Sequence, residues 1–440
     1  MKEGNNMGET VKFTKEMRKK YTILAPMMLP IHFSMFEQIL RDCGYHVEIL
    51  RSTDQAVIDE GLKNVHNDIC YPALLVIGQM IDALKSGKYD VHRTALMITQ
   101  TGGGCRASNY IFLLRKALEN SGFGFVPVIS LNFSGFESGS GFQITAPMLL
   151  KGSFAAIYGD MLMCVANQCR PYEKRRGDTQ RVVDRWVERL CKQFHSTRFL
   201  RVKQNYKAIL EDFDAIPRER SEKIKVGIVG EIYMKYSPLG NNSLEDFLVG
   251  EGAEPVVSGL MDFMLYGFTN RFIDQKLYGK RKWFDSFVNV AVRAAVGYVK
   301  KRQNQMIRAI REHGVFVPPA PFSQLEEIVE GFINRGAKMG EGWLLTAEML
   351  EHIHSGVSNI VCTQPFGCLP NHIVAKGMIR KIKDTYPEAN IVAIDYDPSA
   401  TKINQENRLK LMLANARITK ENQMQTQDTQ EQIVREEVYV

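Results

Sequence analysis

The chain has 440 residues, of which 45% are hydrophobic and 24% charged, and these ordinary proportions exclude a disordered, collagen-like or disulfide-dense protein. This length predicts two domains, or three, because a single hydrophobic core stops growing at smaller sizes. The formal net charge of +7 is modest and the basic residues are spread over helical segments, so we expect no nucleic-acid binding.

The N-terminal segment, residues 1–20, is polar and charged, and we expect it to be flexible and to lack the apolar core of a signal peptide. Residues 144–166 form the most apolar long segment, but Lys151 and Asp160 interrupt it, which predicts a buried helix or loop instead of a membrane span. We therefore expect a cytoplasmic protein with no membrane contact. The 8 cysteines should then be mostly reduced thiols, available as metal ligands or redox centres.

The first half of the chain alternates strand-like and helical segments. Strands are predicted at residues 21–26, 44–50, 94–99 and 125–130, with helices at 32–43, 73–86 and 107–121 between them. A largely helical region follows at residues 146–214. Alternating strands and helices with short connections predict a parallel sheet that is covered on both faces.

The second half repeats this alternation after a polar connector at residues 217–223. Strands are predicted at 224–230, 253–257, 359–364 and 390–397, and helices from 243, through 311, over 324–355, from 371 and over 403–416. The fold class is therefore α/β, with two doubly wound parallel-sheet domains and additional long helices. The domains span residues 21–216 and 223–417, and the Gln-rich residues 418–440 are predicted to form a flexible polar tail.

Three cysteines stand where helices are predicted to begin. Cys70 lies in "NDICYPALLVIG", Cys105 follows three glycines in "TGGGCRASNY", and Cys368 lies in "TQPFGCLPNH". A helix start stabilises an anion and lowers the pKa of a cysteine thiol, and flanking glycines let backbone N–H groups approach a ligand closely. Together the three positions suggest a binding site for a sulfur-rich inorganic anion. Taken singly, each has another explanation: a buried small hydrophobe at Cys70, a nucleophile or loop residue at Cys105, and packing between prolines at Cys368.

The other cysteines lack this local design. Core packing is the expected role of Cys43, Cys164, Cys169 and Cys191, whereas Cys362 closes a strand six residues before Cys368 and is an auxiliary ligand candidate. His372, beside Cys368, is expected to support the helix and not to act as a ligand.

Two further motifs have weaker implications. The loop at residues 230–242, "GEIYMKYSPLGNN", could bind a phosphate before the helix that follows. It matches neither nucleotide-binding glycine pattern, so nucleotide binding is not expected. Asp395 and Asp397 in "IDYDPSA" could act as an acid–base pair or hold a hard cation, but Asp-Pro after a strand is more typical of a turn.

With these motifs in place, the chain resembles the 2-hydroxyacyl-CoA dehydratase D-component family. The resemblance covers residues 21–417 and rests on "NDICYPALLVIGQ", "TQTGGGCRASNY", "VGEIYMKYSPLGNN", "QPFGCLPNH" and "IDYDPSATKINQENR". It is nearest to the branch found as the C-terminal portion of large activase-related proteins, and more distant from the double-cubane iron–sulfur proteins.

The resemblance implies flavodoxin-like domains and an oxygen-sensitive iron–sulfur cluster, either a 4Fe–4S unit or a double cubane, held by Cys70, Cys105 and Cys368. It also implies anaerobic metabolism, a homo- or heterodimer, and a separate ATP-dependent activase that delivers low-potential electrons. Catalytic members dehydrate 2-hydroxyacyl-CoA or reduce small molecules. A non-catalytic electron carrier or cluster-holding subunit would use the same cysteines. A structural zinc site is disfavoured, since zinc ligands usually come in closely spaced pairs.

Overall fold

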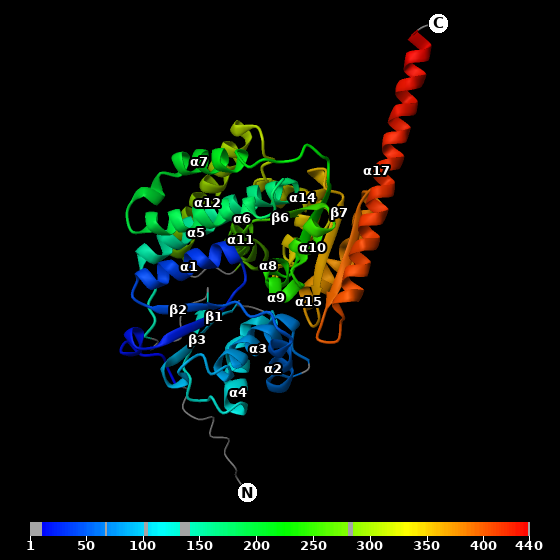
Figure 1. Cartoon of the computed structure of the whole chain (residues 1–440). Helices are drawn as coiled ribbons and strands as arrows, with labels where there is room; N and C mark the ends of the chain where they lie inside the picture. The colour runs from blue at the N-terminus through cyan, green and yellow to red at the C-terminus, as the bar shows by residue number, and fades with distance from the viewer. Residues whose placement is uncertain (1–10, 67, 101–103, 133–140, 280–284, 439–440) are drawn as a thin grey trace.

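A computed structural model of the chain describes residues 11–66, 68–100, 104–132, 141–279 and 285–438. Figure 1 shows two β-sheets surrounded by helices. The first sheet is parallel, in the order β2-β1-β3-β4, and its strands are β1 (Thr22–Pro26), β2 (His46–Leu50), β3 (Thr94–Gln100) and β4 (Val128–Asn132). These strands confirm the four that the sequence predicts for the first half.

Helices cover both faces of the first sheet, as a parallel sheet requires. In Figure 1, α1 (Pro30–Asp42) lies on one face, and α3 (Tyr71–Lys85) and α4 (Tyr110–Asn120) lie on the other. The sequence analysis did not predict α2 (Gln55–Asn64), of which only two residues are buried. Short 3-10 helices complete this half: η1 (Met17–Lys19), η2 (Val91–Arg93) and η3 (Arg106–Asn109).

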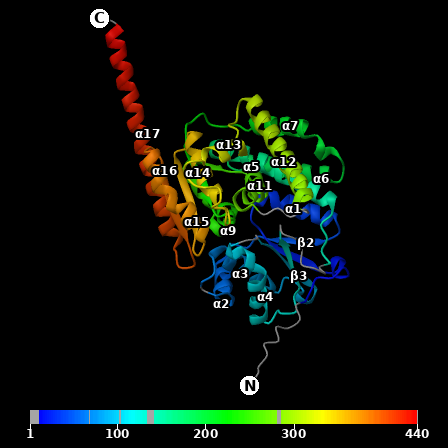
Figure 2. The same ribbon diagram turned by 180° about the vertical axis from the view of Figure 1, so that it is seen from behind.

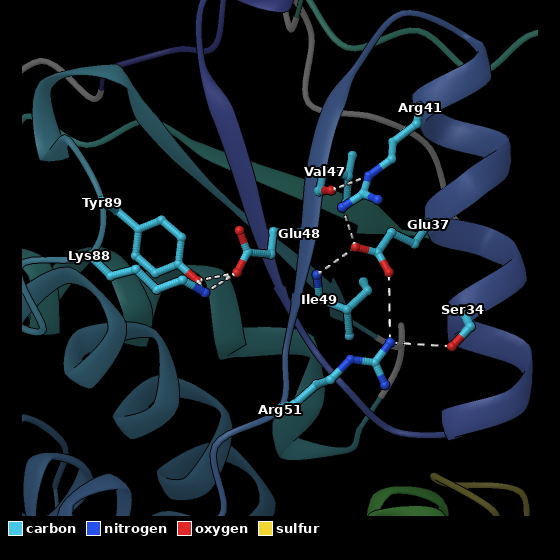
Figure 3. A network of polar contacts seen from close by, with 9 residues as sticks. All are labelled: Ser34, Glu37, Arg41, Val47, Glu48, Ile49, Arg51, Lys88 and Tyr89. Carbon is cyan, nitrogen blue, oxygen red and sulfur yellow. Dashed lines mark hydrogen bonds and ion pairs between the residues drawn. The ribbon is translucent and has the colours of Figure 1, made fainter.

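Strand β2 forms one edge of the first sheet, and charged side chains surround it (Figure 3). Glu37 of α1 accepts hydrogen bonds from Arg41 Nη2 at 2.7 Å and from the backbone N–H of Ile49 at 3.4 Å. Glu48 of β2 accepts a hydrogen bond from Tyr89 Oη at 2.5 Å. Charged groups along an edge strand discourage pairing with a strand of another molecule, so this network protects the exposed edge.

The second sheet repeats the strand order of the first. It is parallel, in the order β6-β5-β7-β8, and its strands are β5 (Ile224–Gly230), β6 (Ala253–Val257), β7 (Asn359–Pro365) and β8 (Asn390–Tyr396). These four strands are also the ones predicted. The α/β class with two parallel-sheet domains and additional long helices is therefore confirmed.

The helices of the second half are more broken than the sequence indicates. Short helices follow β5, and others flank β7: α8 (Ile232–Tyr236), α9 (Pro238–Asn241), α10 (Leu244–Gly250), α13 (Phe322–Ile328), α14 (Trp343–His354), α15 (Leu369–Val374), η6 (Lys376–Met378) and α16 (Ile379–Thr385). The helix predicted over residues 324–355 is thus wrong in its middle, where the chain leaves α13 and re-enters a helix only at α14. Gly340 in this gap has a φ of +59°, a left-handed conformation that no α-helix contains.

Long helices from both halves form one helical layer. The predicted helical region 146–214 contains α5 (Ala146–Cys169), η4 (Arg170–Tyr172), α6 (Asp178–Phe194), η5 (Arg198–Leu200) and α7 (Val202–Asp214). They share a hydrophobic core with α11 (Leu260–Tyr278) and α12 (Asp285–His313). A second core contains Leu96 of the first sheet and Val226 of the second. The two predicted domains therefore pack through continuous apolar interiors.

One helical segment among the described residues, Ala146–Tyr172, is long and apolar enough to cross a membrane, with a mean hydropathy of 1.4 over its most apolar window. Inside the protein, 67% of that window is buried, as in the core helix of a soluble protein. The sequence prediction of a buried helix over this segment is confirmed.

Both ends of the chain differ from the sequence-based expectation. Residues 1–10 of the predicted flexible N-terminus lie outside the described residues, but Phe13 is buried in the core of the first sheet. The predicted last helix, 403–416, and the predicted flexible tail, 418–440, belong largely to one helix, α17 (Lys402–Val438). Its far end projects from the body in both views (Figures 1 and 2). Lys, Glu and Gln favour helix even without an apolar stripe, which explains the extension.

Candidate cysteine site

The three cysteines singled out in the sequence all stand at helix starts. Cys70 is the N-cap residue of α3, and Cys368 is the N-cap residue of α15. Cys105 caps η3, which runs directly into α4. Cys105 and Cys368 follow the central strands β3 and β7, so they lie at the carboxyl ends of the two sheets, where ligands bind in folds of this type. Residues 101–103 of the glycine loop lie outside the described part of the chain.

The loop that carries Cys368 lies directly against Cys70. The backbone N–H of Tyr71 donates a hydrogen bond to the carbonyl oxygen of Phe366 at 3.0 Å. Gly367, which follows Phe366 and precedes Cys368, has a φ of +73°, and a Cβ atom at this position would lie 3.0 Å from Cys70 Cα. A side chain here would collide with the start of α3, so glycine permits the close approach.

The segment between α13 and α14 brings Cys105 to the same place. The backbone N–H of Gly104 donates to Met339 Sδ at 3.3 Å. A Cβ atom at Gly340 would lie 3.8 Å from Cys105 Sγ and 3.2 Å from Pro370 Cγ, and Pro370 belongs to α15. The structure therefore gathers the three predicted cysteines into one region at the boundary of the two sheets, which we call the cysteine site.

The thiols of this site differ from the expectation of a lowered pKa. Burial raises the pKa of Cys70 to about 11. Burial also raises the pKa of Cys368 well above its ordinary value, and the nearby carboxylates of Glu341 and Glu231 raise it further. For these two cysteines the effect of the helix start is outweighed, so the expected easy ionisation is wrong for the chain alone. Coordination to a cation deprotonates a thiol outright, so a bound metal would reverse this balance.

Two carboxylic acids that the sequence analysis did not single out adjoin the cysteine site. Glu231 follows β5 and accepts a hydrogen bond from the backbone N–H of Met234 at 2.9 Å. Glu341 is 7% exposed and accepts one from the backbone N–H of Ile232 at 3.0 Å. Burial raises the pKa of both carboxyls, and the Glu341 charge raises that of Glu231 further. The only signal in the sequence was the position of Glu231 directly after a strand.

Helices α8 and α14 are joined by a buried ion pair. Lys235 Nζ is 2.7 Å from Glu348 Oε1 of α14, and the two residues are 3% and 1% exposed. Lys235 belongs to the 230–242 segment, for which phosphate binding was considered. Because its ammonium group points inward to Glu348, it is not presented to a phosphate in solution.

The auxiliary candidate Cys362 lies elsewhere. It is fully buried in the core formed by β7 with α14, and its thiol donates to Asn371 Oδ1 at 3.4 Å. Burial raises the pKa of the Cys362 thiol to about 12. The structure thus places Cys362 in a packing environment, where its side chain contacts Asn371 of α15, the helix that Cys368 caps.

The other residues considered in the sequence analysis pack in the core, lie on the surface or stabilise a turn. Core packing is confirmed for the other cysteines, which lie in or against hydrophobic clusters: Cys43, Cys164, Cys169 and Cys191. The His372 side chain is exposed on α15. The turn expected after β8 is confirmed, because Asp397 Oδ1 accepts hydrogen bonds from the backbone N–H groups of Ser399 at 2.7 Å and Ala400 at 2.9 Å. Asp395 pairs with Lys376 at 3.0 Å.

In the part of the chain that the structure describes, no group of three or more His, Cys, Asp or Glu side chains is close enough to hold a single metal ion. Compared with known proteins, the sequence matches no protein-family model and no curated protein sequence. The family resemblance and the ligand role of the cysteines therefore stay predictions.

Proposed function

We propose that the chain holds an iron–sulfur cluster through Cys70, Cys105 and Cys368. The observation that carries this proposal is the meeting of three cysteine-capped helix starts from both sheets, held together by the Tyr71–Phe366 hydrogen bond and the close approach of Gly340. Helix starts and exposed backbone N–H groups favour an anionic group, and Cys thiolates are the usual ligands of iron–sulfur clusters.

The donor set fits a cluster better than it fits one zinc ion. Zinc ligands usually come in closely spaced pairs along the chain, whereas these thiols come from three separate segments. A cluster of several irons is wider than one ion and is held from several corners. Three thiolates would leave one iron of a 4Fe–4S unit open to a substrate, to water, or to a sulfide shared with a second cubane.

The system that we propose is a 2-hydroxyacyl-CoA dehydratase-like or ATP-dependent reductase system in the cytoplasm, with electrons delivered by a separate activase. The cluster, when bound, would supply the one-electron step. The chain's own contribution would include a proton source, because the raised pKa of Glu231 keeps its carboxyl protonated closer to neutral pH. Elimination of water and reduction both require proton transfer, whereas an electron carrier does not. Glu231 is therefore the candidate proton source if the chain is an enzyme, whereas a non-catalytic carrier would need none.

The test compares two cysteine variants that are purified without oxygen. We expect the wild-type chain to contain iron and acid-labile sulfide and to absorb visible light. Cys105→Ala should lose most of the iron, because it removes a ligand. Cys164→Ala should keep it, because Cys164 is partly buried against the helical core, away from the site.

Equal iron contents in the two variants would overturn the assignment of the ligands. Zinc without sulfide would indicate the structural zinc site instead. If the cluster is present, assays with an activase, ATP and 2-hydroxyacyl-CoAs or small reducible molecules separate an enzyme from a carrier: reduction of the cluster without turnover of any of these compounds would favour the carrier.

A further inference from the structure

The phenol of Tyr110 touches the sulfur of Cys70. Tyr110 Oη lies 3.0 Å from Cys70 Sγ, and the two residues are 9% and 5% exposed, so the contact is shielded from water. In the chain alone either atom can donate the hydrogen. When Cys70 is a thiolate ligand, its sulfur carries no hydrogen, and only the phenol O–H of Tyr110 can donate.

Tyr110 and Cys105 belong to one short, stiff segment. Cys105 caps η3, and Tyr110 is the first residue of α4 immediately after it. The carbonyl oxygen of Cys105 accepts hydrogen bonds from the backbone N–H of Ser108 at 3.1 Å and from Ser108 Oγ at 2.8 Å. The segment therefore carries Cys105 itself and contacts Cys70 through the Tyr110 hydroxyl.

We propose that Tyr110 is a positioning residue for the cluster, which donates a hydrogen bond to the Cys70 sulfur and thereby makes the cluster easier to reduce. A hydrogen bond withdraws negative charge from a ligand sulfur, which stabilises the reduced, more negative cluster. The same bond fixes Cys70 relative to the segment of Cys105. This inference rests on the proposed function, since it needs a cluster on Cys70.

The test measures the reduction potential of the cluster in Tyr110→Phe, which removes the hydroxyl and keeps the ring. Iron and sulfide per chain should match the wild type. The equilibrium constant for reduction should fall roughly tenfold, which for one electron is about 59 mV towards lower potential. The matched control is Tyr158→Phe. It removes a buried hydroxyl that donates to the Phe199 carbonyl at 2.6 Å in the helical layer, and the potential should not change.

A second measurement uses the wild-type protein directly. Electron-nuclear double resonance of the reduced cluster should detect an exchangeable proton that disappears in D₂O and is missing in Tyr110→Phe. An unchanged potential and an unchanged proton signal in a fully loaded Tyr110→Phe protein would overturn the role of Tyr110 and leave the cluster assignment intact.

The remaining outcomes are also decisive. If folded Tyr110→Phe loses its iron, the hydroxyl is required to hold the ligand, and the expectation of a fully loaded variant with only a lower potential is overturned. If the wild-type chain itself contains no iron and sulfide, the proposed function fails first, and this inference fails with it.

Discussion

The two sheets have the same strand order, yet the helices between the edge strand and the next central strand differ: α2 and then α3 follow β2, whereas α11 follows β6 directly. In the first half, α3 begins at Cys70, within the cysteine site. In the second half, α11 begins against Asp160, whose carboxylate oxygens accept the backbone N–H groups of Leu260 at 2.8 Å and Met261 at 2.9 Å. The carboxylate of α5 thus occupies the start of α11. The comparison teaches that an equal strand order does not fix what meets a helix start: Cys70 caps α3, where the backbone N–H of Tyr71 donates to the Phe366 carbonyl, whereas a carboxylate from α5 meets the start of α11.

The largest expected loss of stability comes from removing the Asp160 carboxylate from the start of α11. Asp160 also lies 2.8 Å from His32 Nε2, and the two side chains are 2% and 0% exposed. Asp160→Ala would leave the start of α11 and His32 buried without their partner, so we expect a loss of about 3–5 kcal/mol in the free energy of unfolding. Urea denaturation measures this loss.

The first half supplies the comparison variant for that experiment. Cys70→Ala removes one buried sulfur, and in the cluster-free protein we expect a loss of only about 1 kcal/mol. If Asp160→Ala destabilised the cluster-free chain no more than Cys70→Ala does, the distinction between a helix start that depends on a buried carboxylate and one that is capped by a cysteine would be wrong.

The strands and the positions of the cysteines could be predicted from the sequence because both are local. Apolar runs bounded by glycine and proline gave β3 and β7, and Cys105 and Cys368 follow these strands directly. The length of α17 was missed because polar helix formers carry no periodic signal. The break between α13 and α14 was missed although the sequence carries a signal for it, because Gly331, Gly336, Gly340 and Gly342 all lie in this gap.

The rest of the site depends on contacts between distant segments. Nothing near Asp160 in the sequence indicates that it reaches α11, and nothing near Glu341 indicates that it approaches Cys368. The thiol pKa was misjudged for the same reason. The helix start that lowers a thiol pKa is a local feature, whereas the burial that raises the pKa of Cys70 comes from the fold around it.

Two buried histidines sharpen the comparison between the halves. His32 has Asp160 as its partner, whereas His352 of α14 is 1% exposed, and burial together with the Lys235 charge lowers its pKa from 6.5 to about 3. The unfolded chain therefore takes up a proton at this histidine below pH 6.5, and the folded chain does so only near pH 3. This difference destabilises the fold progressively as the pH falls from 6.5 to 3.

We expect His352→Leu to remove that contribution. Between pH 7 and pH 5 the variant should lose about 2 kcal/mol less of its unfolding free energy than the wild type, since each pH unit below 6.5 corresponds to about 1.4 kcal/mol. Urea denaturation at the two pH values measures the difference. Glu351 also titrates in this range and its Oε2 lies 3.2 Å from His352 Nδ1, so the effect of His352→Leu is measured in a Glu351→Gln background as well. Equal pH dependence in both would show that His352 is protonated in the folded chain.

The smallest expected effect on stability concerns the contact that joins the halves at the cysteine site. Gly367 and Gly87 both have a φ of +73°, so alanine at either position should cost about 1 kcal/mol through the backbone alone. They differ in surroundings: among the described residues nothing lies within 4 Å of a Cβ atom at Gly87, whereas at Gly367 it would meet Cys70 Cα at 3.0 Å. Gly367→Ala should therefore push the Cys368 loop away from α3.

This pair of variants separates backbone strain from the geometry of the site. Gly87→Ala should lose stability and keep the wild-type iron content after anaerobic purification, because α3 still begins against the Cys368 loop. Gly367→Ala should lose slightly more stability than Gly87→Ala. It should also lose most of its iron, because Cys368 would move away from Cys70 and Cys105. Equal iron contents in the two variants would mean that the close approach of Gly367 to Cys70 is not needed to hold the cluster.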